Sequence, residues 1–195
     1  VGQNLLVINP GQNAKDMNLQ RLLCSTKAHS TVSIDGQDSS DLRGNRLAQI
    51  SDAELGRAKG GLLAIASHSG YEASHGIIHH RKLYLSTGGG NLRGSDRLEY
   101  SGAPGEIARL AVVRFHLHPR VTAAMLSNQR VLIKIRGNRI GWVFRANSTV
   151  SLDTSLFFDI EGRRNCQQIV VNITIANIRS IGTEEIKWAF QRNDP

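Results

Sequence analysis

Apolar and polar residues alternate along much of this chain, which is typical of strands that bury one face. The clearest run covers residues 111–118, where Val113, Phe115 and Leu117 fall on one side. The residues on the other side, Arg114, His116 and His118, are polar. Residues two apart on a strand share a face, so this run predicts a half-buried strand. The same alternation predicts strands over residues 62–67, 80–85, 131–136, 141–145, 150–158 and 168–175.

Short polar and glycine-rich segments separate these runs. Gly137-Asn138 is a tight-hairpin signal, and residues 86–91 indicate a looser hairpin tip. The segment Ser51-Asp52-Ala53-Glu54 has the form of a helix capping box, which predicts a short helix running to Ala58, with a loop as the alternative. Residues 186–190 alternate like an edge or closing strand, and we expect Trp188 and Phe190 in the core.

The number and spacing of these segments predict the fold class. Roughly ten short strands follow one another without long amphipathic helices and without strand–helix–strand alternation. This arrangement predicts an all-β fold, an antiparallel β-sandwich of two packed sheets. With 195 residues and no internal linker, we expect residues 1–195 to form a single domain.

The charge of the chain favours acidic partners. The formal net charge is +8 and the sequence pI is about 10.1, a balance that attracts nucleic acid and acidic polysaccharide alike. Nucleic acid is disfavoured because aromatic residues make up only 5% of the chain and the basic residues are scattered rather than clustered in runs. A solvated basic surface without a dedicated ligand is the alternative to a polysaccharide site.

Neither the cysteines nor the start of the chain assigns a compartment. Cys24 and Cys166 lie far apart and outside any metal-binding spacing, so we expect buried free thiols, with a disulfide as the alternative in an exported protein. The chain opens at Val1 without Met or a signal-type apolar core, so we expect a fragment, and the periplasm and the cytoplasm both stay open. No stretch is long and apolar enough to predict a membrane span.

Two segments near the start each place a polar side chain at a strand end. Residues 5–11 (LLVINPG) read as a strand that stops at Pro and Gly just after Asn9, and residues 27–36 (KAHSTVSIDG) place His29 before a second strand. Strand ends of this kind can bring Asn9 and His29 together. This pairing resembles the β-domain of heparinase II/III-like polysaccharide lyases, most of all the shorter bacterial members. The resemblance extends to residues 67–71, 79–85, 92–98, 114–119 and 141–144.

The resemblance implies a larger protein. In that family a helical toroid precedes the β-domain, and an acidic, uronate-containing polysaccharide is cleaved by β-elimination in the cleft between them. It therefore implies that this chain is one wall of the cleft and is inactive alone, with the base and acid supplied mainly by the N-terminal toroid domain. A non-catalytic carbohydrate-binding or assembly module derived from the family is the alternative.

The resemblance also implies a divalent metal such as zinc. Several relatives hold a metal through an upstream histidine, an aspartate at the strand end and the histidine that corresponds to His29. Here Asn9 stands in the place of that aspartate, and a neutral amide is a weaker zinc ligand than a carboxylate. Relatives also place a Tyr between these two positions, and no Tyr occurs between Asn9 and His29. A hydrogen-bonded structural histidine is the alternative role for His29.

Other histidines and a tyrosine are secondary candidates. His116 and His118 are two residues apart, which on a strand places both imidazoles on one face about 6.5–7 Å apart and makes them an alternative metal pair that needs a third ligand. A polar strand face that meets solvent or another domain is the competing interpretation. Tyr71 and His68 flank a Gly turn and are candidates for contact with a sugar, although tyrosines in such places commonly pack a loop. The basic segment His79-His80-Arg81-Lys82 is expected at a solvated strand end, with contact to an acidic sugar as the alternative.

Overall fold

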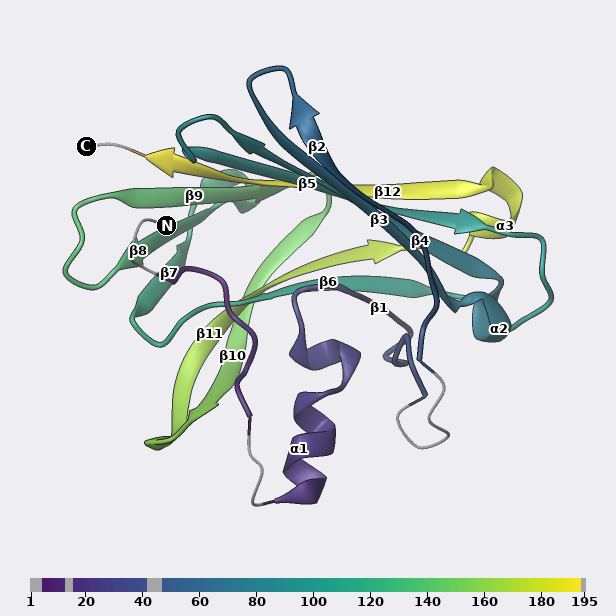
Figure 1. The fold of residues 1–195 in the computed structure, drawn as a ribbon, viewed down its shortest axis with the longest axis horizontal. Coiled ribbons are helices and arrows are strands. Elements are labelled where there is room, and N and C mark those ends of the chain that lie inside the picture. The colour runs from purple at the N-terminus through teal and green to yellow at the C-terminus, as the bar shows by residue number, and fades with distance from the viewer. Residues whose placement is uncertain (1–4, 13–15, 42–46, 194–195) are drawn as a thin grey trace.

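The computed structural model describes residues 5–12, 16–41 and 47–193, which fold into two antiparallel sheets packed face to face (Figure 1). The large sheet has eight strands in the order β2-β3-β4-β5-β12-β9-β8-β7, and the small sheet has four in the order β1-β6-β11-β10. The predicted all-β antiparallel sandwich is confirmed. The strands of the large sheet are β2 (Ile50–Ala58), β3 (Gly61–Tyr71), β4 (Ile77–Ser86), β5 (Asn91–Tyr100), β7 (Val121–Met125), β8 (Val131–Ile135), β9 (Gly141–Ala146) and β12 (Thr183–Asn193). Those of the small sheet are β1 (Val32–Ile34), β6 (Leu110–His116), β10 (Thr149–Asp159) and β11 (Gly162–Thr174).

Short helices occupy the ends of the sandwich. Helix α1 (Met17–Leu23) is capped by the Asp16 side chain, whose Oδ1 accepts hydrogen bonds from the backbone N–H groups of Asn18 and Leu19. It lies against the small sheet, on the side away from the large sheet (Figure 1). The others are η1 (Thr26–Ala28), α2 (Glu72–His75), η2 (Ser127–Gln129) and α3 (Ile178–Ile181). No helix among the described residues is long and apolar enough to cross a membrane.

The core forms where the inward residues of the two sheets meet. Phe115 of the small sheet lies 4.6 Å from the Trp188 ring and 5.3 Å from the Phe190 ring, measured between ring centroids. Both rings belong to the large sheet and are buried, which confirms the prediction that Trp188 and Phe190 are core residues. Edge-to-face aromatic packing of this kind stabilises the core beyond the apolar area that it buries.

Three sequence expectations are wrong at the level of single elements. The segment from Ser51 to Ala58 is part of strand β2 and not a helix, because it pairs along its length with β3. The 186–190 segment lies inside the large sheet between β5 and β9, so β12 is not an edge strand. The segment 5–11 makes two isolated bridges, from Val7 to Leu117 and from Gly11 to Phe158, and no strand ladder.

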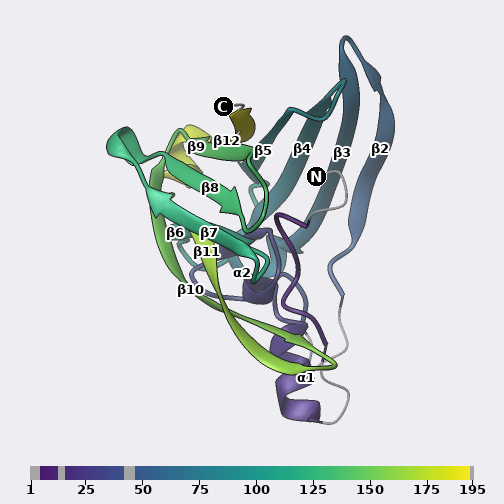
Figure 2. The same cartoon turned by 90° about the vertical axis from the view of Figure 1, so that its left-hand side faces the viewer.

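The large sheet extends beyond the small one. Strands β2, β3 and β4 form a blade that projects away from the rest of the molecule (Figure 2). The edge strand β2 is exposed over nearly its whole length because the second sheet does not reach it. Side chains that both sheets position lie away from the projecting part of β2, β3 and β4. They lie where β1 and β6 of the small sheet face β4 and β5 of the large sheet.

Candidate functional site

His29 lies on a short connection between η1 and strand β1. Its backbone is extended, with φ −119° and ψ 159°, and the side chain is half-buried. Among the residues that the structure describes, the His29 imidazole has no hydrogen-bond or ion-pair partner. A half-buried imidazole without a partner keeps both ring nitrogens available to a ligand.

The backbone on both sides of His29 is held by side chains from both sheets. His116 Nε2 lies 3.0 Å from the carbonyl oxygen of Lys27, and the Arg81 guanidinium donates to the carbonyl oxygen of Ser30. Farther along, the Tyr71 hydroxyl donates to the carbonyl oxygen of Val32 at 2.8 Å. We call residues 27–32 the clamped segment. Three side-chain hydrogen bonds within six residues fix the backbone from which the His29 side chain projects.

The hydrogen bonds of His116 define its tautomer. The Lys27 carbonyl can only accept, so Nε2 carries the proton and Nδ1 accepts from the Ser155 hydroxyl at 2.8 Å. Burial lowers the pKa of His116 below the usual histidine value, which favours this neutral form. The expectation that His116 faces solvent or another domain is wrong, because η1 covers it and only 5% of the residue is exposed.

His118 does not share the environment of His116. Its Nδ1 accepts the backbone N–H of Arg120 at 3.2 Å, and its ring lies 6.0 Å from the Phe157 ring. Among the described residues, no group of three or more His, Cys, Asp or Glu side chains is placed to hold a metal ion. The alternative metal pair of His116 and His118 therefore has no third ligand in the described part of the chain.

A buried ion pair supports the clamp from the large sheet. Asp96 on β5 has no exposed surface, and its Oδ1 lies 2.6 Å from Nε of Arg81 on the neighbouring strand β4. Its Oδ2 accepts the indole N–H of Trp188 at 2.8 Å. Burial alone would raise the pKa of Asp96, but Arg81 and then His79 more than offset it, so the pKa is lowered and the carboxylate is charged. The charged pair orients the guanidinium group that binds the Ser30 carbonyl.

Two histidines extend this network toward the turn at Gly70. The Gly70 N–H donates to His68 Nδ1, so the proton of His68 is on Nε2, which lies 2.9 Å from His79 Nδ1. His79 in turn donates from Nε2 to Asp96 Oδ1 at 2.8 Å. Burial, and then electrostatic repulsion from His79, lower the pKa of His68 to about 4, so the His68 ring is neutral at neutral pH. His68 thus acts within the network, and sugar contact by His68 stays a prediction.

Tyr71 is a structural side chain in this arrangement. It has no exposed surface, and burial raises the pKa of its hydroxyl above the usual tyrosine value. Its hydroxyl is committed to the Val32 carbonyl. The predicted contact between Tyr71 and a sugar does not fit this placement, because a fully buried ring offers no surface to a ligand.

Asn9 lies near His116 but completes no zinc site. The N–H of Ile8 donates to the carbonyl of His116 at 2.9 Å, and the carbonyl of Pro10 accepts the N–H of Phe158 at 2.7 Å. His116 therefore joins the Asn9 segment, through its carbonyl, to the clamped segment, through its ring. Tetrahedral zinc takes four ligands, and Asn9 and His29 would supply at most two, one of them a neutral amide. The described residues do not fit a zinc site that this chain completes alone.

The sequence did not predict the buried residues that support the clamped segment. His79, Arg81 and Asp96 were expected at a solvated strand end or were not singled out, yet they point into the sandwich. The alternation of strand faces could have indicated their burial. Arg81 is two residues before Leu83 and Asp96 is two residues before Leu98, so each charged residue shares a strand face with an apolar one. Charged residues in register with core positions indicate a buried ion pair.

Both cysteines are free, as expected, but Cys24 is exposed and Cys166 is half-buried.

The comparisons with known proteins agree with this fold. Residues 1–189 match the model of the family described as heparinase II/III-like, C-terminal. FtsZ-localized protein C of Caulobacter vibrioides is 31% identical over 141 residues, which cover 68% of this chain and 24% of that protein.

Solved structures of lyases share the fold at low sequence identity. A mutant of the heparan sulfate lyase HepC from Pedobacter heparinus superposes with a TM-score of 0.73 at 15% identity, covering 97% of this chain and 29% of HepC. A heparinase III, the BT4657 gene product, gives 0.70 at 10% identity, covering 97% of this chain and 28% of that one. The chain thus spans under a third of the length of each relative that it matches here.

Proposed function

Because the chain belongs to the heparinase II/III-like family, we propose that it forms one wall of the substrate cleft of a polysaccharide lyase. The substrate would be an acidic polysaccharide that contains uronate, cleaved by β-elimination. The reacting base and acid would come mainly from an N-terminal toroid domain of the same polypeptide. The family match confirms the resemblance predicted from the motifs, while the cleft and the substrate belong to the proposal.

The observation that carries the proposal is the clamped segment. An imidazole without a partner in the described structure projects from a backbone segment that His116, Arg81 and Tyr71 hold from both sheets. Building a rigid backbone around one free side chain is what a binding or catalytic site requires, since misplacement of about 1 Å costs rate. A histidine with only a structural role would spend its own ring nitrogens on such hydrogen bonds.

His29 has a defined role in this reaction. A base removes the proton beside the uronate carboxylate, a carbon–carbon double bond forms, and the bond to the leaving sugar oxygen breaks as an acid protonates that oxygen. The reaction becomes easier when the carboxylate charge is neutralised. We assign His29, with the exposed Lys27 two residues earlier, to hold the uronate through hydrogen bonds and charge. No step of this role uses a metal ion.

The test is lyase activity of the full-length polypeptide that carries this chain. Wild type and His29→Ala are incubated with a panel of uronate polysaccharides, and the ultraviolet absorbance of the unsaturated product is followed. We expect product from at least one substrate, a loss of about 10²-fold or more in His29→Ala, and none from the 195-residue chain alone. Equal activity of wild type and His29→Ala would contradict the role of His29.

A second function is favoured by two observations. Asn9 replaces the aspartate expected at that position, and a relative at 31% identity carries a name that places it with FtsZ. Both fit a non-catalytic carbohydrate-binding or assembly module that kept the sandwich and lost the chemistry. A folded full-length protein that binds acidic polysaccharide but releases no unsaturated product would support this alternative over the lyase.

A further inference from the structure

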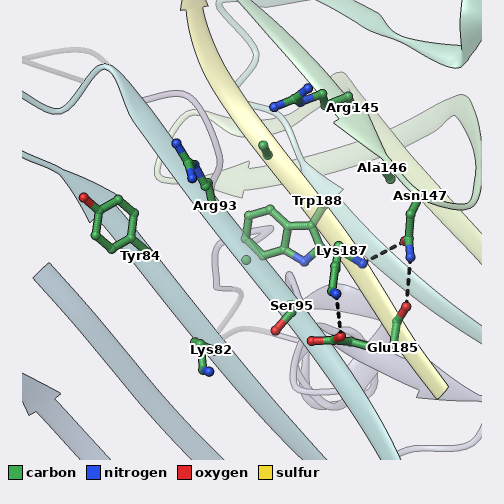
Figure 3. Close-up of a pocket in the computed structure, with 12 residues that line it drawn as sticks. Lys82, Tyr84, Arg93, Ser95, Arg145, Ala146, Asn147, Glu185, Lys187 and Trp188 are labelled. Carbon is green, nitrogen blue, oxygen red and sulfur yellow. Dashed lines mark hydrogen bonds and ion pairs between the residues drawn. The ribbon is translucent and has the colours of Figure 1, made fainter. Parts of the chain in front are cut away.

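The outer face of the large sheet carries a pocket that the clamped segment does not use. It has a volume of about 600 Å³ and lies over β4, β5, β12 and β9 (Figure 3). Arg81 and Lys82 are adjacent on β4 and point to opposite faces, so the pocket and the clamped segment lie on opposite sides of this sheet. The pocket is a separate site.

The strand register explains both the hollow and its charge. One row across the sheet places Arg93 opposite Ala189, and Ala189 opposite Arg145. The next row places Lys82 opposite Ser95, and Ser95 opposite Lys187. In each row a small residue separates two cationic ones, which stand two strands apart, or about 9.6 Å between backbones. The small residues form a floor, and the long cationic side chains rise around it.

Most of these cations are unpaired. Lys187 lies 3.0 Å from Glu185, the one carboxylate in the pocket lining, as the dashed line in Figure 3 marks. Lys82, Arg93 and Arg145 make no ion pair with any residue that the structure describes. The Arg93 guanidinium instead lies over the Tyr84 ring, 5.8 Å from its centroid. Cations without an ion-pair partner around a floor of small residues make a site for an anionic ligand.

We propose that this pocket binds the carboxylate or sulfate groups of an acidic oligosaccharide, as a second contact site for the polysaccharide on the face away from His29. The choice of substrate class rests on the proposed function. Two rows of cations match a linear polyanion whose charges repeat along the chain. A single-stranded nucleic acid is disfavoured because its bases need open aromatic faces for stacking. The lining has two aromatic residues, of which Tyr84 lies under Arg93 and Trp188 is only 5% exposed.

The test compares two variants of equal charge in the 195-residue chain. Arg93→Gln with Arg145→Gln removes two cations from the pocket, and Arg57→Gln with Arg163→Gln removes two exposed cations elsewhere. Affinity for a sulfated heparin hexasaccharide is measured by calorimetry, beside a neutral hexasaccharide and a DNA hexanucleotide. We expect the pocket variant to bind the heparin probe about tenfold more weakly and the control less than about threefold more weakly.

Three outcomes would overturn the proposal: equal losses in the two variants, no binding of the heparin probe by wild type at low salt, or DNA binding that is as tight and as sensitive to the pocket variant. His29→Ala leaves every residue of the pocket lining in place, so a loss of binding in that variant would report on the clamped segment and not on the pocket. Loss of lyase activity in that variant and loss of binding in the pocket variant are therefore separate results, and either proposal can fail without the other.

Discussion

The two faces of strands β4, β5 and β12 treat charge in opposite ways. On the inner face, Arg81, Asp96 and the indole N–H of Trp188 join in one buried network. On the outer face, their chain neighbours Lys82, Ser95 and Lys187 line an open pocket. One residue along each strand separates a group committed to the fold from a group that a ligand can reach.

This difference indicates which charged groups on such a sheet are free to bind a ligand. A charge that is buried away from water must be paired, as Arg81 and Asp96 are on the inner face. The Arg81 guanidinium also donates to the carbonyl oxygen of Ser30. The outer cations stay hydrated, so leaving them unpaired costs the fold little. The inner face therefore sets the geometry of His29 from within, and the outer face offers charge directly.

Neutral substitutions at adjacent residues on the two faces should have very different effects on stability. Arg81→Met leaves Asp96 buried without its main counter-charge, so we expect a loss of about 3–5 kcal/mol in the free energy of unfolding. Lys82→Met is expected to change it by less than about 0.5 kcal/mol. Urea denaturation of the 195-residue chain measures both. In Arg81→Met with Asp96→Asn no unpaired charge is left, and it should lose less than Arg81→Met alone; an equal or larger loss would contradict the ion-pair argument.

A substitution at Gly94 tests the packing between the two faces. A Cβ atom at Gly94 would lie 2.1 Å from Cζ2 of the Trp188 indole, a rigid ring held by its bond to Asp96. Gly94→Ala is therefore expected to cost about 1–3 kcal/mol and to shift the tryptophan fluorescence. Gly56→Ala on β2 is the control, because nothing lies within 4 Å of its Cβ position. Similar stability of the two variants would show that the ring can move aside.

The sequence predicted most of the fold because alternation reports burial wherever one face is apolar. It failed at β5, where the inward positions include Gly94 and Asp96 instead of a run of large apolar residues. It also failed at β2, whose two faces are both exposed, so that the capping-box pattern at Ser51 had no apolar alternation to contradict it. Local sequence patterns predict secondary structure reliably only where the burial of the segment in the fold agrees with them.

The candidate site was predicted in its parts and not in its organisation. His29, His116, Tyr71 and His68 all belong to the clamp or to its support, but three of them stabilise the backbone around the fourth. Residue type and spacing indicate which groups can bind a ligand. They do not show which groups are already committed, because that depends on contacts such as the one between Arg81 and Ser30, which are 51 residues apart.

The pH dependence of stability tests the histidine part of the inner network. The folded pKa of His68 is about 4, below the value of 6.5 for an unperturbed side chain, so the unfolded chain binds more protons between these values. Stability should therefore fall as the pH drops from 6.5 to 4, by about 1–2 kcal/mol from His68 after allowance for its partial exposure. His68→Gln should flatten this part of the profile, measured by thermal unfolding, whereas Ile133→Val, which removes no titratable group, should not. A profile unchanged in His68→Gln would place the titrating group elsewhere.

The smallest effect on stability tests the clamp most directly. Tyr71→Phe keeps the buried ring and removes only the hydroxyl that binds the Val32 carbonyl, so we expect a loss of about 0.5–1.5 kcal/mol. If that bond helps to orient His29, the same change in the full-length protein should lower kcat more than a stability-matched variant far from the clamp, such as Ile133→Val. Ile133→Val removes one buried methyl group, for a similar cost of about 0.5–1.5 kcal/mol. Equal kcat values in these two variants would mean that Tyr71 supports the fold alone, and that the clamp works through His116 and Arg81.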